Sequence, residues 1–119
     1  MSIHPRFGFV VEYVKDIDAA TRFYTDVLGL EVERTHPTFV QFDHFAIATD
    51  APVGSSGEAE LYWLVDDADR AFYEISKTAR VILPLDLKPF GKVFAVADAD
   101  GRPRYILELA KDRPSERVD

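Results

Sequence analysis

Few side chains in this sequence are of a type that does chemistry. Cysteine is absent, which excludes disulfides, thiolate metal sites and cysteine nucleophiles. The one Ser-Ser pair, Ser55-Ser56, has no base beside it, and no serine triad, phosphate loop or nucleotide fingerprint is visible. The remaining candidates are three histidines and two carboxylates on predicted strands, Glu60 and Glu108.

Carboxylates and imidazoles hold divalent metal ions or move protons. His4 is expected in a tail and His36 in a turn, whereas His44 stands at the end of a predicted strand. Two carboxylates with water suit Mg²⁺, but Zn²⁺, Fe²⁺ and Ni²⁺ prefer at least one imidazole. The competing interpretation is that the histidines are solvated or hydrogen-bonded residues and the carboxylates lie at the surface.

Composition limits the classes of function. The chain of 119 residues is 47% hydrophobic, which predicts one packed domain. No apolar run approaches the ~18 residues of a membrane span, and the absence of cysteine fits a cytoplasmic protein. A net charge of −7 disfavours nucleic acid and membranes as partners and favours neutral or cationic small molecules. The simpler explanation of the acidic surface is solubility.

The stretch from Phe23 to Val32 predicts the end of an amphipathic helix and the start of a strand. Asp16 is the expected N-cap, and Gly29 the residue that ends the helix in a left-handed conformation. The predicted buried face comprises Ile17, Ala20, Tyr24, Val27 and Leu28. The strands predicted around this helix are Phe7 to Val14, Leu30 to Arg34 (ended by Thr35-His36-Pro37), Thr38 to Asp43, and His44 to Thr49.

The pattern begins again after a linker over residues 50–57. Asp67 is a second N-cap, and a shift of 51 residues places Val65 and Asp67 on Val14 and Asp16, which indicates an internal duplication. The second predicted helical face comprises Ala68, Ala71, Phe72 and Ile75. The strands predicted in this half are Glu60 to Val65, Arg80 to Leu85, Lys92 to Ala97, and Arg104 to Leu109.

These elements predict an α+β fold of two tandem βαβββ modules. Module one covers about residues 7–50, module two about residues 58–110, and residues 111–119 are a charged tail. The eight strands are expected to form a curved sheet with the helices on its convex faces. The concave faces would then form one groove between the modules.

With these elements in place, the chain resembles the vicinal-oxygen-chelate superfamily, which includes glyoxalase I, extradiol dioxygenases, methylmalonyl-CoA epimerase and the bleomycin-resistance proteins. The matching segments are VKDIDAATRFYTDVLGLEV in the first half, and LVDDADRAFYEI and PFGKVFAVADADG in the second. The resemblance covers residues 7–110 and implies a single domain over residues 1–119. It does not select one activity, because the superfamily hosts several chemistries and some pure binders.

The resemblance also implies four metal-ligand positions, one on the first and one on the last strand of each module. They fall at Phe9, about Ala48, Glu60 and Glu108. Phe9 and Ala48 cannot bind a metal, so no metal cofactor is expected. The alternative is one divalent metal ion held by Glu60 and Glu108.

Strand alternation selects Glu108 over Tyr105, although Tyr105 has the family's usual spacing of four residues after the Gly of DADG. Tyr105, Leu107 and Leu109 form an apolar set that would pack under a helix, which turns Glu108 toward the groove. The other residues expected toward the groove are Phe9, Val11, Tyr13, His44, Ala46, Ala48, Glu60, Tyr62 and Leu64. Glu12 is left beneath a helix, where it needs a partner such as Arg22 or a bulge that turns it away.

The bleomycin-resistance proteins fit these substitutions best, because they lack the metal ligands and trap a cationic, aromatic-bearing ligand in an acidic groove of a dimer. The resemblance therefore implies a metal-free homodimer that sequesters a hydrophobic or cationic small molecule, such as an antibiotic. The expected ligand-binding residues are Phe9, Tyr13, His44, Glu60, Tyr62, Phe90 and Glu108.

Three alternatives stay open at this point. The aromatic residues could be ordinary core or dimer contacts. The protein could be a divalent-metal-dependent lyase, isomerase or dioxygenase that uses Glu60 and Glu108. The groove could also be vestigial, with the domain serving as an interaction module.

Overall fold

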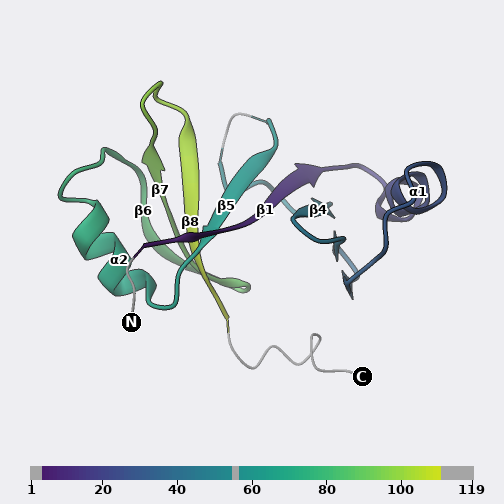
Figure 1. Ribbon diagram of the computed structural model, residues 1–119, viewed down its shortest axis with the longest axis horizontal. Coiled ribbons are helices and arrows are strands. Elements are labelled where there is room, and N and C mark those ends of the chain that lie inside the picture. The colour runs from purple at the N-terminus through teal and green to yellow at the C-terminus, as the bar shows by residue number, and fades with distance from the viewer. Residues whose placement is uncertain (1–3, 55–56, 111–119) are drawn as a thin grey trace. The chain divides into compact units, whose positions relative to one another are not determined.

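The structure is a computed structural model that describes residues 4–54 and 57–110 (Figure 1). It divides into two compact units, which we call the N-terminal unit (residues 9–60) and the C-terminal unit (residues 4–8 and 61–110). Strand β1 (Arg6–Tyr13) begins in the C-terminal unit and continues into the N-terminal unit. The predicted tail over residues 111–119 lies outside the described residues.

The N-terminal unit is a four-stranded sheet with a helical segment on one face. Its strands follow the order β2 (Arg34–His36), β3 (Phe39–Gln41), β4 (Phe45–Ala48) and β1. β1 and β4 are parallel, and the other pairs are antiparallel. The helical segment consists of α1 (Ile17–Arg22) and the π-helical turn η1 (Phe23–Val27), and α1 contacts β3 and β4.

The C-terminal unit repeats this plan. Its strands follow the order β5 (Glu60–Leu64), β8 (Pro103–Leu109), β7 (Gly91–Ala97) and β6 (Val81–Lys88). Figure 1 shows α2 (Ala68–Ile75) beside β6, β7 and β8, the three strands that it contacts. Among the described residues, no helix has the length and apolar character needed to cross a membrane.

The whole strand order is β2-β3-β4-β1-β5-β8-β7-β6, an open sheet of parallel and antiparallel pairs. Each half of the chain therefore supplies a βαβββ repeat, and the predicted α+β class with eight strands and two helices is confirmed. β1 and β5 hold equivalent places, because each is parallel to the last strand of its own repeat.

Both helices begin at the predicted caps. The Asp16 carboxylate accepts a hydrogen bond from the Ala19 amide at 3.0 Å, and the Asp67 carboxylate accepts one from the Arg70 amide at 3.1 Å. Each cap satisfies one of the backbone donors that a helix leaves unpaired in its first turn. The two halves of the chain therefore make the same capping hydrogen bond, as the internal duplication in the sequence predicts.

The predicted burial of Val27 and Leu28 is wrong. Their side chains are 66% and 55% exposed, because the helix widens into η1, where the Leu28 amide donates to the Phe23 carbonyl at 3.3 Å. One extra residue in a turn rotates the following side chains by about 100° around the axis. Gly29 ends the helix with φ of 77°, as predicted.

The second strand is also displaced from its predicted place. Leu30 to Glu33 lie outside any strand, and β2 instead covers Arg34–His36. Pro37 and Thr38 form the tight connection to β3, which pairs His36 with Phe39 and Arg34 with Gln41. The turn therefore sets the register, and Thr35 and His36, which were predicted to end the strand, are part of it.

Each helical face packs on a core cluster of its own unit. In the N-terminal unit the helical residues Ile17, Ala20 and Tyr24 pack on Val40, Phe42 and Ile47. In the C-terminal unit the predicted helical face of α2 packs on Phe94, Val96 and Ile106. These two clusters fix which face of each sheet is turned toward its helix.

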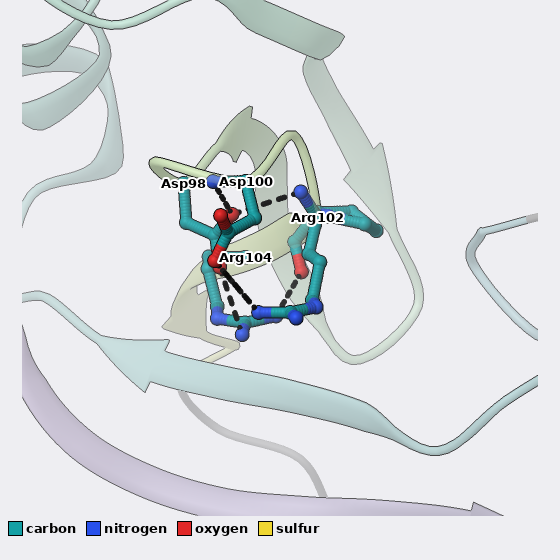
Figure 2. A network of polar contacts seen from close by, with 5 residues as sticks. Asp98, Asp100, Arg102 and Arg104 are labelled. Carbon is teal, nitrogen blue, oxygen red and sulfur yellow. Dashed lines mark hydrogen bonds and ion pairs between the residues drawn. The ribbon is translucent and has the colours of Figure 1, made fainter.

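The DADG sequence closes the hairpin between β7 and β8 (Figure 2). The Asp98 carboxylate accepts hydrogen bonds from the backbone amides of Arg102 and Asp100 at 2.9 and 2.8 Å, and it forms an ion pair with Arg104 at 3.0 Å. These interactions, the Arg102 amide first, lower the pKa of Asp98 below its usual value. The Asp98 carboxylate therefore stabilises this hairpin turn.

Candidate functional site

The N-terminal unit has a face that is turned away from its helix. Tyr13, Ala48 and Phe39 are register partners on the neighbouring strands β1, β4 and β3, so their side chains share one face. The next row along the strands holds Glu12 and Ile47 and is turned toward the helical segment, because Ile47 belongs to the core beneath it. The predicted facing of Tyr13 and Ala48 is therefore confirmed.

Glu60 is the most unusual residue of this unit, since it is a carboxylate with only 2% of its surface exposed. One carboxylate oxygen accepts a hydrogen bond from the Tyr13 hydroxyl at 2.6 Å. The other accepts one from the backbone amide of Gly54, also at 2.6 Å. The structure thus joins two of the predicted site residues, Tyr13 and Glu60, and adds a backbone donor that the sequence did not reveal.

Phe9 lies on the same face of β1 as Tyr13, four residues earlier. It is buried, and its ring meets the edge of Phe39 with the centroids 6.1 Å apart. Ala46 and Ala48 of β4 are buried as well. This face therefore combines two phenylalanine rings and two small residues with the Tyr13–Glu60 pair and with the polar residues Gln41, Arg34 and His36, which the register of β3 and β2 places on the same side.

Glu12 has a partner beneath the helix, but not the predicted one. The Tyr24 hydroxyl of η1 donates to a Glu12 carboxylate oxygen at 2.5 Å. That hydrogen bond, together with desolvation and the carboxylate charge, raises the pKa of Tyr24 to about 12. The Glu12 carboxylate therefore does not depend on an ion pair with Arg22 or on a bulge that turns it away, because the neutral phenol of Tyr24 donates a hydrogen bond to it.

In the C-terminal unit, Tyr62 stacks on Tyr105 with ring centroids 5.2 Å apart and an interplanar angle of 25°. The two residues are register partners on β5 and β8. The next row, Trp63 and Ile106, packs with α2, so the tyrosine pair lies on the opposite face of the sheet. The predicted facing of Tyr62 is confirmed, whereas Tyr105 was predicted on the wrong face.

The sequence predicted Glu108 on the same face of the sheet as Tyr62, and this prediction is wrong. Its carboxylate accepts a hydrogen bond from the Ala68 amide at 2.8 Å, at the start of α2. Its register partner Lys92 reaches Asp69 of α2 at 2.7 Å, which marks the same side. The alternation rule failed because Tyr105, Ile106 and Leu107 are all buried, so hydrophobicity does not distinguish the two faces of β8.

The two other predicted residues lie in turns. His44 precedes β4, its side chain is exposed, and its Nε2 lies 3.7 Å from an Asp43 carboxylate oxygen. Phe90 lies between β6 and β7, where its carbonyl accepts a hydrogen bond from the Ala110 amide at 2.8 Å.

The side chains at the four metal-ligand positions that the resemblance implies do not form a donor set that fits a divalent metal. Phe9 and Ala48 offer no donor atom, and Glu108 is turned toward α2, which leaves Tyr105 at the spacing usual in the family. One carboxylate and one phenol are not a set that Zn²⁺, Fe²⁺ or Mg²⁺ prefers. Within residues 4–54 and 57–110, no group of three or more His, Asp or Glu residues is arranged to hold a metal ion.

Comparison with known proteins agrees with this fold. Residues 6–43 match the family described as bleomycin resistance protein-like N-terminal. A glyoxalase/bleomycin resistance protein/dioxygenase superfamily member from Vibrio splendidus 12B01 superposes with a TM-score of 0.62 at 23% identity, over 88% of this chain and 99% of the other. No curated protein matches the chain.

Two further solved structures share the fold. The NAD-dependent benzaldehyde dehydrogenase from Legionella pneumophila has a TM-score of 0.69 at 24% identity, over 86% of this chain and 98% of the other. The 2,3-dioxygenase LapB from Pseudomonas sp. KL28 has a TM-score of 0.57 at 15% identity, over 90% of this chain and 43% of the other. Because the identities are low and the activities of these proteins differ, the likenesses concern the fold alone.

Proposed function

This chain has the fold of the vicinal-oxygen-chelate superfamily, the glyoxalase, bleomycin-resistance and dioxygenase proteins, and from that premise we propose that it is a metal-free small-molecule-binding protein. It sequesters a hydrophobic or cationic ligand against aromatic side chains. The observation that carries the proposal is the donor set: Phe9 and Ala48 are buried apolar residues at two ligand positions, and Glu108 is turned toward α2.

Each unit carries a pair of largely buried aromatic side chains on the face away from its helix. The N-terminal unit has the edge-to-face pair Phe9 and Phe39, and the C-terminal unit has the stacked pair Tyr62 and Tyr105. Aromatic rings bind flat ligands through dispersion and stacking, and they attract cations through their electron-rich faces. These residues support a binding role for the faces that metal ligands occupy in the family's enzymes.

The alternative of a metal-dependent lyase, isomerase or dioxygenase has no observation in its favour. It requires Glu60 and Glu108 as ligands, and both carboxylates accept hydrogen bonds from the protein's own donors. Glu108 in addition lies on the α2 side of its sheet. A proton-transfer step by either residue would first require those hydrogen bonds to break.

Binding is tested by thermal unfolding in EDTA with bleomycin and with small cationic and neutral aromatic compounds. We expect the melting temperature to rise with ligand concentration, since a ligand at about 100 times its Kd stabilises the folded state by about 2.7 kcal/mol. The Phe9→Ala variant should lose most of this rise, whereas Tyr73→Ala on the exposed face of α2 should keep it. A rise that appears only when a divalent metal is added, or no rise with any compound, would contradict the proposal.

We also propose that the protein is a homodimer, which is supported by an exposed apolar segment in the N-terminal unit. Five of its large hydrophobic side chains are exposed within ten residues, although most such residues are buried in a folded chain. They are Phe23, Val27, Leu28, Leu30 and Val32.

Light scattering is expected to give twice the chain mass of 13.5 kDa. Val27→Glu should shift the protein to the monomer at micromolar concentration, because a charge at the centre of an apolar interface is left without water or partner. Tyr73→Glu, a similarly exposed position in the C-terminal unit, should leave the mass unchanged. A monomeric wild type, or a Val27→Glu variant that stays dimeric, would count against this interface.

A further inference from the structure

We propose that ionic strength controls the dimerisation of this protein, because the exposed apolar segment through which the two copies meet, residues 23–33, lies in a strongly acidic unit. The dimer weakens at low ionic strength, where the two copies repel each other, and tightens as salt is added. This inference rests on the homodimer proposed above and concerns the regulation of that interface.

One of the two units carries the net negative charge of the chain. The N-terminal unit (residues 9–60) contains ten acidic and three basic residues, so its excess of seven negative charges equals that of the whole chain. The C-terminal unit (residues 4–8 and 61–110) contains eight acidic and eight basic residues. Two copies that meet through their N-terminal units therefore bring their acidic halves together, and like charges repel.

The apolar segment itself contains three carboxylates and no basic residue. Asp26, Glu31 and Glu33 stand next to its exposed hydrophobic side chains, and all three are exposed. In the described part of the chain, none of these carboxylates forms an ion pair. A second copy that covers the segment therefore approaches three negative charges that no cation of the chain compensates by direct contact.

Two arginines flank the segment without neutralising it. Arg34 is the register partner of Gln41, which pairs with Ala46, so its side chain lies on the face of the sheet away from the helical segment. Arg22 is the last residue of α1 and is exposed. One arginine beside three carboxylates leaves this part of the surface negative.

The backbone of the segment is tied to its unit at two points. The Leu30 amide donates to the Tyr24 carbonyl at 2.9 Å, and the Glu33 amide donates to the Gln41 carbonyl at 2.8 Å. A surface that is already ordered loses less conformational entropy on association than a flexible one. The burial of apolar side chains and the repulsion between charges are then the main opposing contributions to the stability of the dimer.

Salt acts strongly on the second of these contributions. The screening length is about 30 Å at 0.01 M salt and about 3 Å at 1 M. At low salt the acidic residues of one unit therefore repel those throughout the facing unit, whereas at high salt only charges in close contact interact. Sulfate and phosphate also strengthen apolar burial, so sodium chloride is the salt that isolates the repulsion.

The test is the dissociation constant of the dimer, measured by sedimentation velocity at about 0.02 M and about 0.5 M NaCl. For the wild type this constant should be at least about tenfold lower at the higher concentration. In the neutral variant Asp26→Asn/Glu31→Gln/Glu33→Gln the two values should differ by less than about threefold, and the dimer should be tighter than that of the wild type at low salt. The matched control Asp26→Glu/Glu31→Asp/Glu33→Asp retains the charges and should show the salt dependence of the wild type.

The possible outcomes separate this inference from the proposed dimer. A wild-type dissociation constant that is independent of salt, or that rises with it, overturns the inference and leaves the dimer standing. A neutral variant with the full salt dependence of the wild type also overturns it. A wild type that is monomeric at both salt concentrations contradicts the dimer and the inference together. Should a variant fail to fold in thermal unfolding, the wild-type comparison alone decides the salt dependence.

Discussion

Gly91→Ala is expected to lower the free energy of unfolding by about 3 kcal/mol or more, or to prevent folding. Gly91 opens β7 with φ of 148°, a conformation that residues with a Cβ rarely adopt. A Cβ added there would lie 2.1 Å from the Glu108 carbonyl oxygen and 3.0 Å from the Ala110 amide nitrogen. Both are backbone atoms of β8 and the residue after it, so they cannot rotate away as a flexible side chain would.

Gly29→Ala is the matched control, because Gly29 also has a positive φ, 77°, but nothing lies within 4 Å of an added Cβ. Its cost should be the conformational one alone, about 1 kcal/mol. Denaturant unfolding of both variants measures the difference. Equal costs would mean that the close approach of β7 and β8 at Gly91 is not a constraint on the fold.

Tyr24→Phe is expected to cost about 1.5–3 kcal/mol at pH 7, the usual range for a hydrogen bond to a charged group. The substitution removes the hydroxyl that donates to Glu12 at 2.5 Å and leaves a partly buried carboxylate with one partner fewer. The ring contacts with Phe42 and Phe45 remain, so the variant isolates the hydrogen bond from the packing. Tyr73→Phe, in which the lost hydroxyl belongs to an exposed side chain, should cost less than about 0.5 kcal/mol.

The same hydrogen bond predicts a dependence on alkaline pH. The pKa of Tyr24 is raised from its ordinary value of 10.0 to about 12 in the folded protein. The stability contributed by the protonated phenol is therefore fully present below pH 10 and is lost as the pH rises through 12. The difference in stability between wild type and Tyr24→Phe should be constant from pH 7 to 9 and shrink above pH 10. A difference that stays constant above pH 10 would contradict the raised pKa.

The helix ends could be predicted from the sequence, because they depend on residues close to them in the chain. Asp16 and Asp67 cap the helices as expected, and Gly29 ends the first one, because each depends only on neighbouring backbone groups. Helical periodicity failed at Val27 and Leu28, since it assumes 3.6 residues per turn and η1 contains one residue more. No residue type marks a π-helical turn in advance.

The facing of β8 could not be predicted from hydrophobic alternation. Tyr105, Ile106 and Leu107 are all buried, so the pattern has no polar side to identify. The spacing usual in the family that the chain resembles favoured Tyr105 as the residue that faces away from the helix. The structure places Tyr105 on that face. Glu108 was chosen as a site residue because strand alternation turned it toward the groove, but it lies at the first turn of α2, where its carboxylate accepts a hydrogen bond from the Ala68 amide.

The partners of the buried carboxylates were missed for a different reason. Glu12 was expected to pair with a cation, yet a phenol satisfies it, and Glu60 is held partly by the Gly54 backbone. A backbone amide is present at nearly every position, so the sequence does not say which one donates. Tyr13 and Glu60 were both named as candidates, but their contact across 47 residues needed the structure.

Elemental analysis tests most directly the proposal that this chain binds small molecules without a metal. The protein is incubated with Fe²⁺, Mn²⁺, Ni²⁺, Zn²⁺ and Mg²⁺, separated from free ions, and its metal content is measured per chain. The donor set at Phe9, Ala48, Glu60 and Tyr105 predicts a content far below one equivalent for every ion. One equivalent of a single metal that is lost in Glu60→Gln would contradict the proposal and favour the alternative of a metal-dependent enzyme.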